Sequence, residues 1–190
     1  MKIDSLCVRY GDKLVLDHFS AEFPQGITLI TGPSGYGKTT LLHTIAGLIT
    51  PESGTITGRP EKIGLMFQDD RLFPWLSALQ NINVSCDDIE KARYYLKAVE
   101  LENEADARPD SLSGGMRRRV AFARALAYDA DLLLLDEPFK GMDLPLIERL
   151  APLIRNLSIP VILSTHSPEE QAIIGGTLLP MDAMNEVEHD

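Results

Sequence analysis

A glycine-rich run at residues 32–40 has the composition of a phosphate-binding loop. It reads Gly32, Pro33, Ser34, Gly35, Tyr36, Gly37, Lys38, Thr39 and Thr40, which matches the pattern G-x-x-x-x-G-K-[ST] at every fixed position. Glycines let the backbone adopt positive φ angles and bring its N–H groups close to phosphate oxygens. The lysine of this pattern reaches the β- and γ-phosphates, and the hydroxyl that follows it ligates Mg²⁺. The run therefore predicts a nucleotide site in which Lys38 and Thr39 have these two roles.

Two adjacent acids, Asp136 and Glu137, follow an unbroken apolar run at residues 132–135. Such a run is typical of a strand that is buried on both faces of a parallel sheet. Ligands of open α/β sheets lie at the carboxyl ends of the strands. We therefore expect Asp136 to hold Mg²⁺, directly or through water, and Glu137 to orient or deprotonate an attacking water. The alternative is that both acids are solvated turn residues.

Three further side chains lie at the ends of predicted strands. His166 follows the apolar run at residues 160–165, and the shared strand-end position favours a γ-phosphate contact over a structural or surface role. Tyr10 precedes a Gly-Asp turn; it could stack on adenine, or it could equally be a half-buried strand residue. Gln68 ends the run at residues 63–67 and, taken alone, indicates only a polar strand end.

A second glycine-containing segment, residues 112–116, opens a predicted helix. Ser113 is a good N-cap, and Gly114 and Gly115 follow it. Two glycines at a helix start cost up to ~1 kcal/mol each, so a functional reason for them is favoured over a simple capped helix. A serine hydroxyl and bare N–H groups at a helix N-terminus predict a second anion site.

The surrounding sequence predicts the elements that would position these residues. Short apolar runs predict strands and turns within residues 1–24, and strands at 27–31, 55–57, 63–67, 132–135, 160–165 and 177–179. Apolar residues at helical spacing predict helices over residues 41–48, 89–99, 113–126 and 144–156. The polar stretch 103–110 predicts a linker, and the acidic residues 185–190 predict a frayed tail.

Composition limits the classes of partner. The chain has 190 residues and a formal net charge of −10, which argues against nucleic acid, although residues 116–119 form a possible local basic patch. No apolar stretch approaches the ~20 residues of a membrane span, and residues 1–4 lack the apolar core of a signal peptide. We therefore expect a cytosolic protein whose membrane role needs a partner. Cys7 and Cys86 lack metal-ligand spacing and predict neither a metal site nor a disulfide.

Together these motifs resemble the nucleotide-binding subunit of an ATP-binding cassette (ABC) transporter over nearly the whole chain. The resemblance makes residues 32–40 the Walker A loop, although Tyr36 is bulkier than the usual residue there, and residues 132–137 the Walker B strand. It also makes Tyr10 the adenine-stacking aromatic. Gln68 then corresponds to the Q-loop glutamine, which contacts Mg²⁺ and the attacking water.

Other matches depart in part from the family pattern. Residues 112–116 resemble the LSGGQ signature with methionine in place of glutamine. Asp143 resembles the D-loop aspartate, although residues 139–143 read FKGMD instead of the commoner serine-alanine-leucine-aspartate ending. His166 resembles the switch histidine. These departures leave hydrolysis as an expectation but put the fine coupling between sites in doubt.

The resemblance implies an α/β fold. We expect a P-loop NTPase core with a mostly parallel sheet, an N-terminal antiparallel β subdomain and a small inserted helical subdomain. The chain would be a single domain over residues 1–190. Its core would comprise residues 1–76 and 128–190, and its helical subdomain, with the signature, residues 77–127.

The resemblance also implies ATP and Mg²⁺ as cofactors and head-to-tail pairing with a second ABC ATPase subunit, expected to be another copy of this chain. Ser113, Gly114, Gly115 and Asp143 would then complete the opposite subunit's site. Closure on ATP would drive a transmembrane permease at the cytoplasmic face of the cell membrane, and the loop at residues 73–75 would receive a coupling helix from that permease. Residues 68–75 are similar to importers of nitrate, sulfonates and taurine, which would add a solute-binding protein.

Two other functions remain as alternatives. A soluble ABC ATPase acting on protein assembly, repair or ribosomes would have the same nucleotide-binding residues. The acidic balance and the transporter-like residues 68–75 argue against it. A binding module without hydrolysis is disfavoured because Lys38, Asp136, Glu137 and His166 are all present.

Overall fold

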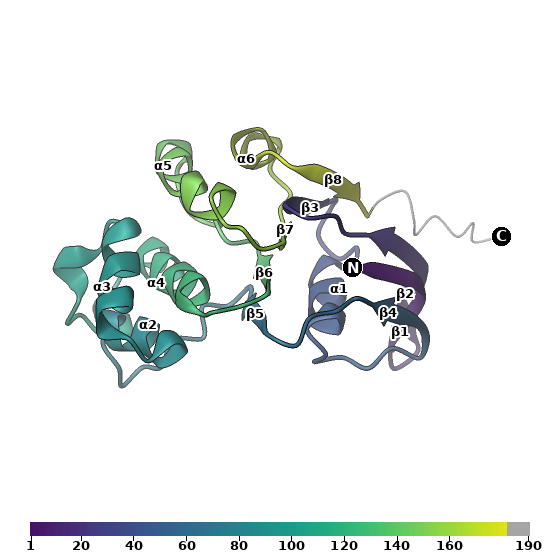
Figure 1. Cartoon of the computed structure of the whole chain (residues 1–190), viewed down its shortest axis with the longest axis horizontal. Helices are drawn as coiled ribbons and strands as arrows, with labels where there is room; N and C mark the ends of the chain where they lie inside the picture. Colours follow the sequence, from purple (N-terminus) through teal and green to yellow (C-terminus); the bar gives the residue numbers. More distant parts are fainter. Residues whose placement is uncertain (182–190) are drawn as a thin grey trace.

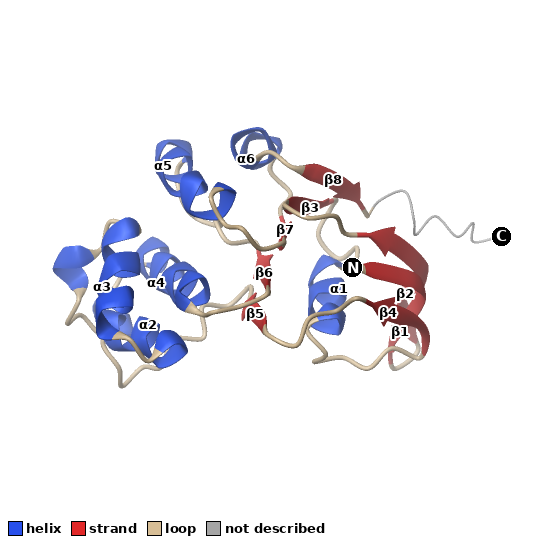
Figure 2. Ribbon diagram, viewed as in Figure 1, coloured by secondary structure: helices blue, strands red, loops and turns tan. Residues whose placement is uncertain are grey.

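The computed structural model describes residues 1–181, so the predicted tail at 185–190 lies outside the described residues. Two sheets form the framework (Figures 1 and 2). A five-stranded parallel sheet has the order β5-β6-β7-β3-β8, and a three-stranded antiparallel sheet has the order β2-β1-β4. The predicted α/β class, with a mostly parallel sheet and an N-terminal antiparallel one, is confirmed.

The bounds of the strands follow the predicted apolar runs closely. The parallel sheet consists of β3 (Ile27–Thr31), β5 (Ile63–Met66), β6 (Leu132–Asp136), β7 (Val161–Ser164) and β8 (Thr177–Pro180). The antiparallel sheet consists of β1 (Lys2–Tyr10), β2 (Lys13–Glu22) and β4 (Ser53–Thr57). β4 begins two residues before its predicted start. Its second residue, Gly54, has a φ of 90°, which glycine adopts without steric strain inside a strand.

Helices cover the parallel sheet and extend beyond it. They are α1 (Lys38–Ile45), α2 (Ala78–Cys86), α3 (Ile89–Ala98), α4 (Gly114–Ala127), α5 (Leu144–Arg155) and α6 (Pro168–Ile174). Figure 1 shows α2, α3 and α4 gathered at the end of the molecule opposite the antiparallel sheet. These three helices lie within residues 77–127, and the division into core and helical subdomain stays a prediction. In the part of the chain described, no helix combines the length and apolar character that crossing a bilayer demands.

The predicted first helix was too long. α1 ends at Ile45, so Leu48 is not on its apolar face and is 59% exposed. The chain leaves the helix at Gly47, whose φ is 79°. A residue in the left-handed region after the last helical turn ends a helix, and glycine adopts it without steric cost.

The sequence patterns did not predict α2 or α6, and they gave residues 103–110 as a plain linker. That linker contains the short 3₁₀ turns Glu102–Glu104 and Pro109–Ser111. A signal for α2 was present: Ser77 and Gln80 form a capping box, in which each side chain bonds the backbone N–H of the other residue. For α6, Ser167 caps the helix and Pro168 begins it.

The core lies on both faces of the parallel sheet. All five residues of β6 are buried. Leu133 and Leu135 pack in a cluster with residues of α2 to α5, whereas Leu132 and Leu134 pack in a second cluster with α1 and the antiparallel sheet. This alternation confirms a strand covered on both faces, and it places the carboxyl end of β6 between the two layers.

Candidate nucleotide-binding site

The phosphate loop joins the end of β3 to the start of α1. Gly37 is the residue before α1 and has a φ of 89°, and Gly32 and Gly35 also have positive φ angles. A Cβ atom on Gly37 would lie 3.0 Å from the Leu16 side chain and 3.3 Å from the Val15 carbonyl oxygen. Glycine is therefore required at Gly37 both for its backbone angle and for space. The N-terminus of α1 faces the loop, as an anion site requires.

The loop borders a hollow of about 370 Å³ that gathers most of the predicted site residues. Those that line it are Tyr10, Ser34, Gly35, Gly37, Lys38, Thr39, Thr40, Gln68, Asp136 and Glu137. Tyr10 is 51% exposed, which leaves its ring accessible to a base. Tyr10 is also the last residue of β1 and about half-buried, so the structure fits the strand interpretation as well, and a contact with adenine stays a proposal.

The side-chain ammonium of Lys38 lies against the backbone of the phosphate loop. Its ammonium donates to the carbonyl oxygens of Gly32 and Pro33 at 2.6 and 2.7 Å. The side chain therefore folds back over the loop toward β3, and the loop's two ends are tied together. The Tyr36 side chain is 38% exposed, so this bulky residue fits the loop.

Asp136 has hydroxyl donors on both carboxylate oxygens. Thr39 Oγ1 donates to Oδ2 at 2.7 Å, and Ser164 Oγ donates to Oδ1 at 2.6 Å. Asp136 is 1% exposed, so these bonds satisfy an otherwise buried charge. Carboxylate and hydroxyl oxygens are the ligands that Mg²⁺ prefers, and here they meet beside the phosphate loop. Thr39 and Asp136 are thus the residues whose chemistry fits a magnesium ion.

Glu137 points its carboxylate toward two other predicted site residues. Gln68 Nε2 donates to Oε2 at 3.4 Å, and His166 Nδ1 lies 3.4 Å from Oε1. Lys140 Nζ lies 3.5 Å from Oε2. The structure therefore brings Gln68, Glu137 and His166 together from three separate strand ends, as their positions in the sequence predict. Their individual roles stay proposals.

The signature and D-loop residues lie outside the lining of this hollow. Ser113 caps α4, where its Oγ accepts from the Met116 N–H at 3.2 Å. Asp143 caps α5, where its Oδ1 accepts from the Leu146 N–H at 3.0 Å. Gly114 and Gly115 form the first turn of α4. Within one chain, Ser113 and Asp143 cap helices and the two glycines begin α4. These residues would contact a nucleotide only if a second chain held it.

The possible basic patch at residues 116–119 is not a row of solvated cations. Arg118 is 3% exposed and donates to backbone carbonyls in the interior. Arg119 donates to the carbonyl oxygens of Val99 and Glu100 at 2.9 and 3.3 Å. A run of arginines in the sequence does not distinguish solvated cations from donors to buried carbonyls, and here the helix turns Arg118 toward β6.

The sequence also did not predict Ser164 as a site residue. Its Oγ accepts from the Glu137 N–H at 3.0 Å while donating to Asp136. A serine inside a buried strand was a usable signal, because a buried hydroxyl needs hydrogen-bond partners. Its partners are 27 and 28 residues away in the sequence, on the neighbouring strand.

Burial raises the pKa of one acid beside the site. Desolvation raises the pKa of the Glu170 carboxyl, while the Thr165 hydroxyl and His166 act to lower it and Glu137 acts to raise it. Glu170 is half-buried on α6 and accepts a short hydrogen bond from Thr165 Oγ1. Thr165 directly precedes His166, so this hydrogen bond lies next to the predicted switch histidine in the chain.

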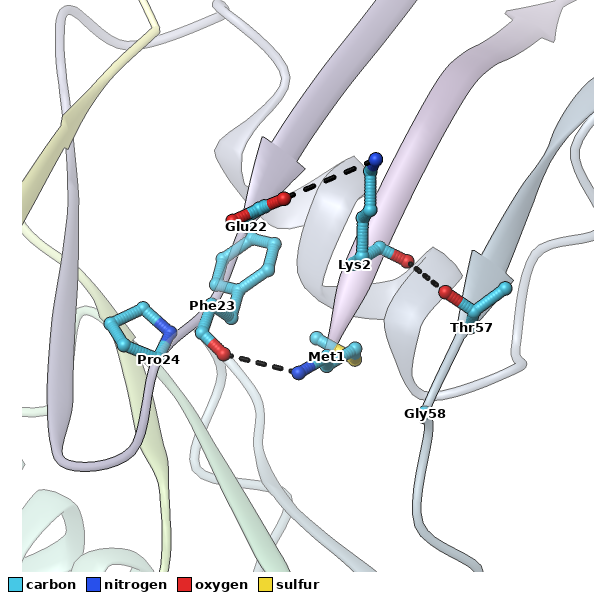
Figure 3. Close-up of a pocket in the computed structure, with 7 residues that line it drawn as sticks. All are labelled: Met1, Lys2, Glu22, Phe23, Pro24, Thr57 and Gly58. Atoms are coloured by element: carbon cyan, nitrogen blue, oxygen red, sulfur yellow. Dashed lines mark hydrogen bonds and ion pairs between the residues drawn. The ribbon is translucent and has the colours of Figure 1, made fainter.

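A larger hollow, of about 560 Å³, opens at the edge of the antiparallel sheet (Figure 3). The Met1 amino group donates to the Phe23 carbonyl oxygen at 3.1 Å, and Lys2 Nζ lies 3.9 Å from the Glu22 carboxylate. Its polar groups thus bond one another, and the predicted site residues are elsewhere. Convergent polar groups identify a ligand site better than size does, so we place the candidate site at the smaller hollow.

One group of potential metal ligands lies on β1 and β2. Cys7, Asp17 and His18 each offer an atom within 4.8 Å of the others. His18 Nδ1 already lies 2.6 Å from Asp17 Oδ1, which accounts for the approach of these two side chains. The group shares no residue with the nucleotide site, and the expectation that Cys7 binds no metal stays a prediction.

Comparison with known proteins identifies the family. The model of the family described as "ABC transporter" matches residues 16–140, which include the phosphate loop, the signature and Asp136 with Glu137. The chain belongs to the ABC transporter family. As a member, it is an ATP-binding protein and an ATPase. The resemblance inferred from the motifs is thereby confirmed.

Relatives of known name are import subunits of ABC systems. The chain is 37% identical to the aliphatic sulfonates import ATP-binding protein of Rhodococcus jostii over 96% of this chain and 78% of that protein. It is 37% identical to the taurine import ATP-binding protein of Pseudomonas aeruginosa over 90% and 72%, respectively. It is 41% identical to the nitrate import ATP-binding protein of Synechocystis over 75% of this chain and 61% of that one.

The fold also matches a solved structure. A dimeric ATP-binding cassette in a post-hydrolysis state, bound to ADP and Pi, superimposes with a TM-score of 0.82 at 27% identity. The match covers 94% of this chain and 93% of the other. This ABC ATPase therefore shares its whole described architecture with a cassette that was solved as a dimer.

Proposed function

We propose that this chain binds ATP with Mg²⁺ in the hollow beside residues 32–40, hydrolyses it, and thereby powers a membrane permease that imports a small solute. One observation carries the proposal. A single hollow is lined by the phosphate loop, the Thr39–Asp136 pair, Gln68 and Glu137, and His166, outside the lining, contacts the Glu137 carboxylate. Phosphate binding, metal binding and activation of a water are the three requirements of phosphoryl transfer to water.

Each residue has a distinct part in the proposed reaction. Lys38 and the N–H groups of the loop bind the phosphates, and Thr39 and Asp136, assisted by Gln68, hold Mg²⁺, which would offset phosphate charge. Glu137 orients or deprotonates the attacking water. Gln68 and His166 flank its carboxylate, so they are placed to direct it toward the γ-phosphate.

The proposed working unit contains two ATPase subunits arranged head to tail. Ser113, Gly114, Gly115 and Asp143 lie outside the hollow of their own chain, at the N-termini of α4 and α5. Helix N-termini attract phosphate, so these residues suit the nucleotide held by a second copy. The dimeric state of the solved relative supports this arrangement.

The proposed membrane partner is a permease, which would hold this chain at the cytoplasmic face of the cell membrane. The names of the relatives support import of a small solute such as a sulfonate, taurine or nitrate, with a solute-binding protein in the full system. Phe73 and Trp75 are 40% and 67% exposed and would contact the permease. Their exposure suits contact with another protein, and the names of the relatives favour the transporter over a soluble ABC ATPase of other function.

The test is Glu137→Gln, compared with Glu148→Gln. Glu137→Gln removes the base and keeps the shape of the side chain, so kcat for ATP hydrolysis should fall at least ~100-fold while ATP affinity stays near wild type. Glu148 is exposed on α5, and Glu148→Gln should leave kcat unchanged. ATPase kinetics and equilibrium ATP binding would be measured on the purified chain. Full activity in Glu137→Gln would overturn the role assigned to this carboxylate.

A further inference from the structure

Arg118 is a buried cation that no part of the proposed reaction yet uses. It lies on α4 and is 3% exposed. Burial of a guanidinium is costly unless its donors are satisfied, so its partners indicate why the residue is tolerated there. Those partners come from the ends of β5 and β6, the two strands that lead into Gln68 and Glu137.

One end of the guanidinium bonds the backbone around Gln68. Nη1 donates to the carbonyl oxygens of Phe67 and Gln68, both at 2.9 Å, and lies 3.1 Å from the Asp70 carboxylate. These two carbonyls belong to the peptide units on either side of the Gln68 Cα. The bonds therefore fix the position from which the Gln68 side chain leaves the backbone.

The other end bonds the backbone around Glu137 in the same manner. Nη2 donates to the carbonyl oxygens of Asp136 and Glu137, the latter at 2.8 Å. These carbonyls belong to the two peptide units that flank the Glu137 Cα. The second unit precedes Pro138, which has no N–H, so its carbonyl is the only polar group by which this unit can be held.

Glu137 needs such support because its backbone is strained. Its φ is 48°, in the left-handed region that a non-glycine residue adopts at a cost of about 1–3 kcal/mol. Ser164 Oγ accepts from the Glu137 N–H at 3.0 Å, and Arg118 holds the carbonyls on both sides. The strained turn points the carboxylate toward Gln68 Nε2, 3.4 Å away.

We propose that Arg118 is a positioning residue for ATP hydrolysis, which sets the Gln68 and Glu137 side chains in register by holding both backbones with one rigid guanidinium. The proposal rests on the proposed function, because it assumes that Glu137 acts on the attacking water. The planar guanidinium offers donors in a fixed fork, so the two strand ends cannot move independently while it remains bonded.

The experiment replaces Arg118 with lysine and with glutamine, and uses Arg119→Gln as the matched control. Lysine keeps the charge, but a single ammonium cannot bond both strand ends. Residues that orient a group at the reaction centre typically contribute 10- to 100-fold, so kcat should fall by about that factor in both Arg118 variants, with ATP affinity near wild type. Arg119 is on the same helix and also bonds two backbone carbonyls, but these lie at Val99 and Glu100. Its loss should leave kcat unchanged.

A double-mutant cycle distinguishes positioning of Glu137 by Arg118 from a general loss of structure in the Arg118 variants. If Arg118 acts through Glu137, Arg118→Lys should not lower the residual rate of Glu137→Gln any further. Thermal melting and ATP binding of every variant accompany the rates.

An inactive wild type would overturn the proposed function itself. With an active wild type, three outcomes would overturn the role of Arg118: an unchanged kcat in Arg118→Lys, rate losses that multiply in the cycle, or loss of ATP binding together with kcat in both Arg118 variants. Arg118→Lys retains the buried charge, so it remains informative if Arg118→Gln does not fold.

Discussion

At the scale of single residues, Asp136 and Glu137 are adjacent in the sequence but differ in backbone conformation and in the direction of their carboxylates. Asp136 completes β6, and its two carboxylate oxygens each accept a hydrogen bond from a hydroxyl. Glu137 follows in the left-handed region and turns its carboxylate into the hollow. The change of backbone angle between the two residues thus places two carboxylates at the same strand end in different positions.

Glu170 should make stability depend on pH in a direction opposite to that of a salt-bridged acid. Burial raises its pKa in the folded state above the ordinary value of 4.5. The folded state then holds the proton at pH values where the unfolded state has lost it. The contribution of Glu170 to stability is therefore full below pH 4.5 and is lost as the pH rises through the folded-state pKa.

Glu170→Gln should remove this dependence. Glutamine is uncharged and its carbonyl oxygen can still accept from Thr165, so the variant should be more stable than wild type at pH 8 and should lose most of that advantage at about pH 4, below the ordinary pKa of the carboxyl. Urea unfolding at the two pH values measures the difference. Glu169→Gln, on the exposed side of the same helix, serves as the control. An equal gain at both pH values would show that Glu170 is not protonated in this range.

At the scale of elements, α2 and α4 hold the segment between β5 and α2. Arg124 of α4 donates to the carbonyl oxygens of Asp70 and Arg71, both at 2.8 Å. Asn81 of α2 is fully buried and accepts from the Phe73 N–H at 2.8 Å. It also donates to three carbonyls of residues 73–77 at 3.0–3.1 Å. An irregular segment without ladder hydrogen bonds is thereby fixed by side chains from two helices.

Asn81→Ala should destabilise the protein and loosen this segment. The change leaves one N–H and three carbonyls without their side-chain partner, and a buried group left unpaired costs about 1–3 kcal/mol. Urea unfolding should report a loss of about this size. Trp75 is the only tryptophan, so its emission reports the segment directly. Asn103→Ala, at an exposed site, should change neither measurement. Wild-type stability in Asn81→Ala would contradict the interpretation.

At the scale of the whole molecule, the antiparallel sheet and the three helices α2 to α4 occupy opposite ends of the parallel sheet (Figure 2). The hollow takes Tyr10 from the antiparallel sheet and its acids from β6 and the residue after it, so it depends on the packing of two layers. On a separate segment, the Phe73 and Trp75 rings pack 5.6 Å apart and remain exposed. The proposed nucleotide site and the proposed partner interface thus consist of different residues of one chain.

Trp75→Ala should weaken assembly with the proposed permease without changing ATP affinity, because the side chain is exposed and lies outside the hollow. The measurement is co-purification of the chain from its native membranes in mild detergent, with the bound proteins identified. Tyr94→Ala removes another exposed aromatic, on α3, and should leave assembly intact. Equal recovery of the membrane protein with wild type and Trp75→Ala would remove the segment from the interface. Recovery of soluble partners alone with wild type would favour the non-transport class.

Local sequence patterns sufficed to predict the phosphate loop, the buried strand β6 and the cap of α4. Each depends on residues that are close along the chain. The loop needs glycines at fixed spacing before a lysine, and a cap needs a short polar side chain within three residues of its N–H partner. The strand-end rule for parallel sheets also predicted that Glu137 and His166 would share one edge, because strand direction alone determines which ends lie together. The role of Gln68 followed only from the resemblance to the family.

Tertiary structure alone decided which residues support that site. Arg118 and Ser164 reach Glu137 across sequence separations of 19 and 27 residues. Such separations carry no periodic signal, and the same arginine run is compatible with a solvated surface. Packing of α4 against the ends of β5 and β6 removes water from the guanidinium, so that it must bond the carbonyls it meets. The sequence therefore determined the groups predicted to contact nucleotide, and the packing of helix against sheet decided how they are held.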